Sequence, residues 1–243
     1  MSDSALQSML LEGHTAKGFD GALTTLHMHV IEMGGLVLDQ VREATQAYTA
    51  WDARSAERVI EREPAVNAYD ARVDEEQLAI IARRQPVASD LKAVIAMSRA
   101  VAELERAGDE AKKIARSVLQ VGGRPGPGTS RDARHLGRLA VDLLLLSLQA
   151  FDRLDGSLAA EVIARDKELD AEYAAGLRRL LTRAMEDPRH FDVALQAAFV
   201  LKSLERIGDH ARNLARQLQS IRPAGSAAPP RVAAATPRPA AGR

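Results

Sequence analysis

The sequence contains an internal repeat that restricts its fold more than any other feature. Residues 104–116 (LERAGDEAKKIAR) and 204–216 (LERIGDHARNLAR) are identical at eight of thirteen positions when they are aligned with an offset of 100. Unrelated helical segments of this length share about one or two identities. With an offset of 103, residues 47–62 match residues 150–165 at six positions. The chain is therefore predicted to be a duplicated unit.

Each unit is predicted to consist of three helices. The stretches between the glycines and prolines are rich in Ala, Leu, Arg and Glu, and only 3% of all residues are aromatic. This composition favours helix over strand. We expect helices at residues 20–50, 52–84, 88–121, 131–152, 155–184 and 189–220. Pro64 falls inside the second helix and should kink or split it. The predicted fold class is all-α, with two three-helix bundles in tandem.

The predicted domain boundaries follow the glycines and prolines. A Gly/Pro-rich linker at residues 122–130 separates a first bundle at 19–121 from a second bundle at 131–221, and residues 1–18 form an N-terminal extension. Residues 222–243 hold five of the ten prolines, four arginines and no acidic residue. This last segment lacks the apolar side chains that would offset the entropy of ordering, so we predict a disordered tail.

Charge, hydropathy and missing motifs exclude several classes of protein. The 33 Lys and Arg residues balance 33 Asp and Glu residues, so no net charge attracts nucleic acid or an anionic membrane. The longest apolar stretch, residues 143–151, is far shorter than the roughly 20 residues of a membrane-spanning helix. The chain has no cysteine, no leader-like N-terminus and no nucleotide-binding or hydrolase motif. We expect a cytoplasmic protein without catalytic activity.

Carboxylate pairs are the chemical feature that the two units share. Glu105 and Asp109 in the first unit, and Glu205 and Asp209 in the second, are spaced four residues apart. On a helix this spacing places both side chains on one face, one turn apart. Because like charges at this spacing repel each other, a bound cation is one physical reason for the arrangement.

A second pair at the same spacing occurs in the preceding helix of each unit. These positions are Asp166 and Asp170 in the second unit, and Glu63 and Asn67 in the first. Up to four oxygen donors could therefore meet between two neighbouring helices. Oxygen ligands favour cations such as iron, manganese, magnesium, calcium or zinc.

A salt-bridge network between the helices explains the same acids without a metal. Acidic residues four apart are common on solvated helix faces, and buried acids need partners of any kind. Spacing does not decide between the metal site and the network. The expected cationic partners in such a network are Arg106, Arg206 or Arg62.

Three segments together resemble the PhoU family of phosphate-signalling regulators. They are ERIGDHARNLA at 205–215, its weaker copy at 105–115, and QPVASDLK at 85–92, and the likeness extends over residues 19–218. The resemblance implies two three-helix bundles related by pseudo-symmetry, with multinuclear iron or zinc clusters held by carboxylates on the bundle surface. The ligands that it implies are Asp166, Asp170, Glu205 and Asp209 in the second unit, and Glu63, Glu105 and Asp109 in the first.

The first unit departs from the family motif at two positions. It has Glu110 and Lys113 where the second unit has His210 and Asn213. We expect the ammonium of Lys113, with Lys112 beside it, to reduce cation affinity or to replace the metal with an ion pair. The first site is therefore predicted to be the weaker one.

The resemblance also implies a function. A regulator of this kind represses the phosphate-starvation response by coupling the ATPase subunit of a phosphate ABC transporter to a sensor histidine kinase. It would be a homodimer that meets the membrane only through these partners. The alternative is a metal-free helical scaffold that serves another phosphate transporter. A ferritin-like metalloenzyme is excluded because the chain has no Glu-x-x-His pair.

Overall fold

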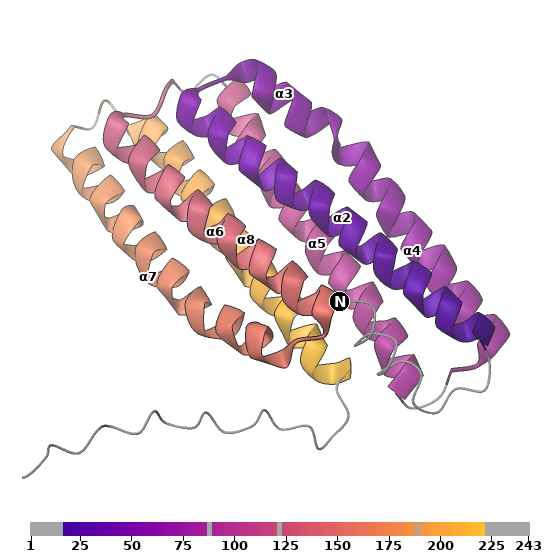
Figure 1. The fold of residues 1–243 in the computed structure, drawn as a ribbon. Coiled ribbons are helices and arrows are strands. Elements are labelled where there is room, and N and C mark those ends of the chain that lie inside the picture. Colours follow the sequence, from indigo (N-terminus) through magenta and orange to yellow (C-terminus); the bar gives the residue numbers. More distant parts are fainter. Residues whose placement is uncertain (1–16, 87–88, 121–122, 188, 190, 222–243) are drawn as a thin grey trace, which may run out of the picture.

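The chain folds into two units of antiparallel helices (Figure 1). The computed structural model describes residues 17–86, 89–120, 123–187, 189 and 191–221. The first unit comprises α2 (Lys17–Ala50), α3 (Ala53–Glu61), α4 (Glu63–Arg84) and α5 (Ser89–Leu119), and the second comprises α6 (Pro127–Arg153), α7 (Gly156–Glu186) and α8 (Phe191–Ile221). The all-α prediction is confirmed. The predicted tail and nearly all of the predicted N-terminal extension lie outside the described residues.

Prolines set two of the helix boundaries. Arg62 ends α3 and precedes α4, and Pro64 lies in the first turn of α4. The predicted split of the second helix is therefore confirmed. Helix α6 begins at Pro127, inside the segment that was predicted to be linker. Both prolines occupy a first turn, where a missing N–H breaks no intrahelical hydrogen bond.

The turn after the first helix is the same in both units. Trp51 and Leu154, which are 103 positions apart, both adopt the left-handed conformation, with φ of 59° and 51°. The next residue is Asp52 or Asp155, and its carboxylate accepts a backbone N–H from the first turn of the following helix, at 3.0 and 2.8 Å. Such caps stabilise helix starts by about 1 kcal/mol. The identities at this offset therefore mark a structurally repeated turn.

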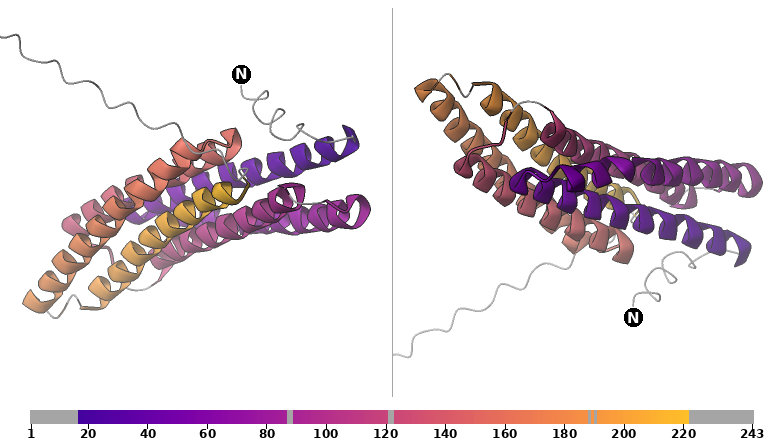
Figure 2. Two further views of the ribbon diagram at one scale, coloured as in Figure 1. Left: turned by 90° about the horizontal axis from the view of Figure 1, so that it is seen from below. Right: turned by 90° about the horizontal axis from the view of Figure 1, so that it is seen from above.

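The two units share one hydrophobic core. Helices α5 and α8 pack against each other at the centre, α2 packs against α6, and α7 and α3–α4 lie on opposite outer sides (Figures 1 and 2). Leu104 and Leu204, which are equivalent in the repeat, are both almost fully buried in this core. Within the described residues, no helix combines the length and the apolar character needed to cross a bilayer.

A glycine stands at the same position of α5 and α8. A Cβ at Gly208 would overlap Cδ2 of Leu169 on α7, and Leu169 is only 1% exposed. The nearest atom to a Cβ at Gly108 would be Oε1 of Gln40, at 3.3 Å, and the side chains of Val37 and Val66 would lie at ordinary contact distance. Close helix approach therefore requires the glycine in the second unit more strictly than in the first.

Replacing these glycines with alanine should have different effects on stability. Alanine gains about 1 kcal/mol of helix propensity at either position. At Gly208 this gain is outweighed by overpacking against Leu169, and we expect Gly208→Ala to lose about 1–3 kcal/mol of unfolding free energy. Gly108→Ala should stay within about 1 kcal/mol of the parent. Urea denaturation of both variants measures the difference, and equal losses would contradict it.

Candidate functional site

The second unit brings its four predicted ligands to the seam between α7 and α8. Asp166 is 3% exposed, whereas Asp170, one turn further along α7, is exposed. Partial desolvation beside α8 and the charges of Asp166 and Asp209 raise the pKa of the Asp170 carboxyl. Asp209 approaches this seam from α8, and Glu205 is connected to it through Lys202, whose charge also acts on Asp209 and Asp170. These side chains form one acidic cluster, which we call the second cluster.

Arg212 bridges two of these carboxylates. Its Nη1 donates to Oδ2 of Asp166, and its Nη2 lies 2.6 Å from Oδ1 of Asp209. Burial would lower the pKa of Arg212, but the hydrogen bond and charge of Asp166 raise it. The other oxygen of Asp166, Oδ1, is buried without a hydrogen-bond partner among the described residues. The second cluster therefore contains an interhelical ion pair and one unsatisfied acceptor.

A lysine neutralises part of the remaining charge. Lys202 Nζ lies 2.6 Å from Oε2 of Glu205 and 5.4 Å from the ring centroid of Tyr173. Burial would lower the pKa of Lys202, but its hydrogen bond to Glu205 raises it. The second cluster thus contains four carboxylates and two cationic side chains, so its net charge is negative.

The corresponding seam of the first unit lies between α4 and α5. Lys112 donates to Oε1 of Glu63. Burial and the charges of Asp109 and Asp70 raise the pKa of Glu105, so these three acids lie close together. Asp70 was not predicted as a ligand, although it shares a helix face with Glu63. We call the acids Glu63, Asp70, Glu105 and Asp109, with Lys112, the first cluster.

The ion pairs of the two clusters are equivalent in the repeat. Glu63 matches Asp166 at the offset of 103, and Lys112 matches Arg212 at the offset of 100. The Glu63–Lys112 pair connects α4 to α5, and the Asp166–Arg212 pair connects α7 to α8. The duplication has therefore retained an acid–base pair as well as the carboxylates.

The clusters differ in their other charges. Lys202 and Tyr173 of the second cluster are replaced in the first unit by Ala102 and Asp70. Lys113, which was expected to weaken the first site, lies elsewhere: its Nζ is 2.8 Å from Oε1 of Glu110. The expectation is therefore wrong for Lys113, whereas Lys112 does form an ion pair with the predicted ligand Glu63. Both clusters contain four acids, but the first has one fewer base than the second.

Two positions where the motif copies differ, 110/210 and 113/213, belong to the contact between α5 and α8. His210 Nδ1 lies 2.8 Å from Oε2 of Glu103, and Asn213 donates to the same oxygen at 3.2 Å. Burial would raise the pKa of Glu103, but these hydrogen bonds lower it. His210 and Asn213 therefore join the two units and do not face the second cluster.

Glu110 makes the matching contact from the other end of the interface. It accepts hydrogen bonds from Lys113 and, at 3.3 Å, from Arg206 of α8. Burial would raise the pKa of Glu110, but these partners and Ser203 lower it. Each carboxylate of α5 at this interface thus meets polar partners from the opposite unit.

The arginines predicted for a salt-bridge network pair with other acids. Arg106 contacts Glu103 at 3.4 Å, and Arg62 contacts Glu43 at 2.7 Å. Arg206 contacts Glu110. None of these three ion pairs involves a predicted ligand. The network exists, but its cations at the clusters are Lys112, Lys202 and Arg212.

The donor chemistry of the clusters suits a hard cation. The unpartnered Oδ1 of Asp166 and the crowded carboxylates of both clusters are oxygen donors with excess negative charge. Within the part of the chain that the structure describes, no three His, Asp or Glu side chains converge on a common metal position. In the second cluster, Arg212 occupies the bridging role that a cation would take between Asp166 and Asp209.

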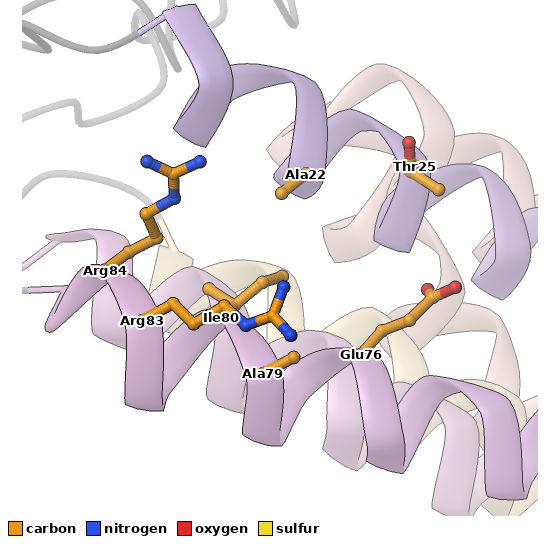
Figure 3. A pocket seen from close by; sticks show the side chains of 7 residues that line it. All are labelled: Ala22, Thr25, Glu76, Ala79, Ile80, Arg83 and Arg84. Atoms are coloured by element: carbon orange, nitrogen blue, oxygen red, sulfur yellow. The ribbon is translucent and has the colours of Figure 1, made fainter.

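A separate cavity of about 260 Å³ lies between the start of α2 and the end of α4 (Figure 3). Thr25 lines it from α2, and Glu76, Arg83 and Arg84 line it from α4. Oε2 of Glu76 also lies 2.8 Å from Nδ1 of the buried His29. None of the seven predicted ligands lines this cavity, so it is distinct from both clusters.

Comparison with known proteins matches the repeat. Residues 30–118 and 133–218 each match the PhoU domain. The phosphate-specific transport system accessory protein PhoU homolog of Pseudomonas aeruginosa is 42% identical over 206 residues, which cover 84% of this chain and 85% of that protein. The phosphate-specific transport system accessory protein PhoU of Escherichia coli is 38% identical over 209 residues, or 86% and 87% of the two chains. These relatives are named as accessory proteins of a transport system.

Solved structures match the fold over the same length. The crystal structure of PhoU from Pseudomonas aeruginosa superposes with a TM-score of 0.81 at 41% identity, over 84% of this chain and 98% of that one. The phosphate transport system regulatory protein PhoU from Streptococcus pneumoniae gives a TM-score of 0.75 at 26% identity, over 84% and 96%. The repeated domain, the relatives and the shared fold lead to one conclusion: this chain belongs to the PhoU family.

Proposed function

We propose that this protein is a regulator of phosphate uptake that represses the phosphate-starvation response. It does so by coupling the ATPase subunit of a phosphate ABC transporter to a sensor histidine kinase. The observation that carries the proposal is the similarity, over more than four fifths of the chain, to two relatives named as phosphate-specific transport accessory proteins. A homodimer is part of the same proposal.

Binding, rather than catalysis, is the proposed mode of action. Large apolar side chains on the second unit are exposed at a spacing of four residues along α8, namely Phe191, Leu195 and Phe199. Exposed apolar surface of this kind favours contact with protein partners. The effect of the protein on its partners should therefore be stoichiometric.

Metal binding by the two clusters is a second part of the proposal. The buried, unpartnered Oδ1 of Asp166 and the raised pKa of Glu105 support it, because a bound cation would offset both. We propose iron or zinc, held by the carboxylates of the seven predicted ligands, with Asp70 as an additional acid of the first cluster. The cation would supply positive charge at the seams between the helices.

Deleting the gene tests the regulatory role. In phosphate-rich medium the deletion strain should express phosphate-starvation genes, and a copy of the wild-type gene should restore repression. An affinity-tagged copy should recover the transporter ATPase subunit or the sensor kinase. Normal repression in a deletion strain that has no second paralogue would reject the regulator and favour a metal-free scaffold for another phosphate transporter.

A further inference from the structure

A second cavity lies where the loop between the two units enters α6. Its volume is about 240 Å³, and it opens among the start of α6, the end of α7 and the start of α8, which meet at one end of the molecule (Figure 1). Its polar lining comprises Arg124, Gly126, Thr129 and Arg183, and its remaining lining is apolar. The loop carries the Gly/Pro run of the sequence, which the proposed function does not use.

The first turn of α6 leaves backbone donors without intrahelical acceptors beside this cavity, which Gly126 and Thr129 line. Gly126 is the N-cap of this 27-residue helix and provides no side-chain cap. Pro127 has no N–H, and the N–H of Ser130 donates to the carbonyl of Gly126 at 3.0 Å. The N–H groups of Gly128 and Thr129 therefore lack an intrahelical acceptor. A helix start of this kind carries partial positive charge and attracts anions.

A guanidinium is packed against this positive helix end. A Cβ at Gly128 would lie only 2.7 Å from Cζ of Arg183, so glycine lets Arg183 approach the first turn. Among the described residues, no carboxylate forms an ion pair with Arg183 or Arg124, and none lines the cavity. Two cations beside a helix N-terminus repel it and each other, and an anion between them would reverse the sign of each interaction.

Thr129 adds an independent indication of a ligand. Only 7% of its surface is exposed, and it lines the cavity. Among the described residues its hydroxyl forms no hydrogen bond. This hydroxyl is therefore free to form a hydrogen bond with a group inside the cavity.

We propose that this cavity binds a phosphate group, either as inorganic phosphate or as the phosphoryl group of a small metabolite. Guanidinium groups and helix N-terminal N–H groups are the donors that phosphate oxygens prefer. Because the polar lining offers donors and no carboxylate acceptor, sulfate competes for the site. Bound phosphate connects the loop between the units to α6 and α7. The site is separate from both carboxylate clusters and does not depend on the proposed regulatory role.

Titration of the full chain tests this site. We expect saturable binding of inorganic phosphate in calorimetry, with shifts of the amide NMR signals of Gly126, Gly128 and Thr129. Arg183→Gln should weaken binding at least about tenfold, because it removes a charge-assisted contact. The matched control is Arg178→Gln, which removes the same charge from an exposed residue of α7 outside this cavity, and it should change affinity less than about twofold.

A second variant and a second ligand complete the test. Gly128→Ala places a Cβ where the Arg183 guanidinium lies, so it should also weaken binding. Tighter binding of glycerol 3-phosphate than of inorganic phosphate would identify a phosphorylated metabolite as the source, and the reverse order would identify the free ion. The proposal is overturned if millimolar phosphate does not bind, or if Arg183→Gln and Arg178→Gln weaken binding equally.

Discussion

Arg212→Met is expected to lower the free energy of unfolding by about 3 kcal/mol at neutral pH in the presence of a chelator. Asp166 is 3% exposed, and Arg212 is its ion-pair partner. The Oδ1 atom of Asp166 has no hydrogen-bond partner among the described residues. The variant would therefore leave a buried carboxylate without compensation, which costs far more than losing a surface pair. Urea denaturation followed by circular dichroism measures the loss.

Two further variants identify buried charge as the cause. Arg216→Met alters an exposed arginine one turn later on α8 and should cost less than about 0.5 kcal/mol. Combining Arg212→Met with Asp166→Leu removes both charges and should recover most of the lost stability. Similar losses for Arg212→Met and Arg216→Met, or no recovery in the double variant, would contradict the explanation.

The helices could be predicted because their signals are local. Pro64 and the glycines interrupt stretches whose composition favours helix, and the structure splits the second helix at Arg62 as predicted. The start of α6 was placed too late because Pro127 was interpreted as part of a linker. Proline both ends helices and begins them, and its position alone does not distinguish the two roles.

The partners of the carboxylates could not be predicted in the same way. The repeat alignment places Lys113 near the carboxylate pair in sequence, but it does not say which helix faces which. Lys112 and Lys113 point about 100° apart on α5, so one reaches Glu63 and the other reaches Glu110. A shift of one residue along α5 thus determines whether a lysine contacts the first cluster or the interface between the units.

The interface between the units explains why the motif copies differ. Glu103 and Glu110 of α5 accept hydrogen bonds from α8, where the equivalent residues are Ser203 and His210. If both helices carried the acids at these positions, carboxylates would face carboxylates across a buried contact. The two copies therefore diverged where they touch each other and retained the ion pair within each unit.

Protein purified without chelator is expected to contain metal, and the first cluster should contribute at least as much of it as the second. Burial and the charges of Asp109 and Asp70 raise the pKa of Glu105. A carboxyl whose pKa is higher in the folded state than in the unfolded state destabilises the fold at neutral pH. This destabilisation disappears as the pH falls and the carboxyl becomes protonated. A bound cation relieves the same repulsion. The second cluster already holds two bases, Lys202 and Arg212, whereas the first holds only Lys112, so the second gains less from a cation.

Elemental analysis of paired variants tests this expectation. Glu105→Ala with Asp109→Ala should remove at least as much metal as Glu205→Ala with Asp209→Ala, and helicity should stay nearly unchanged. The matched control replaces Glu57 and Glu61 with alanine, because these exposed acids have the same spacing on α3. If no preparation binds more metal than the chelated protein, the clusters are ion-pair networks alone. If the control variant loses as much metal as the others, the acids bind cations without a defined site.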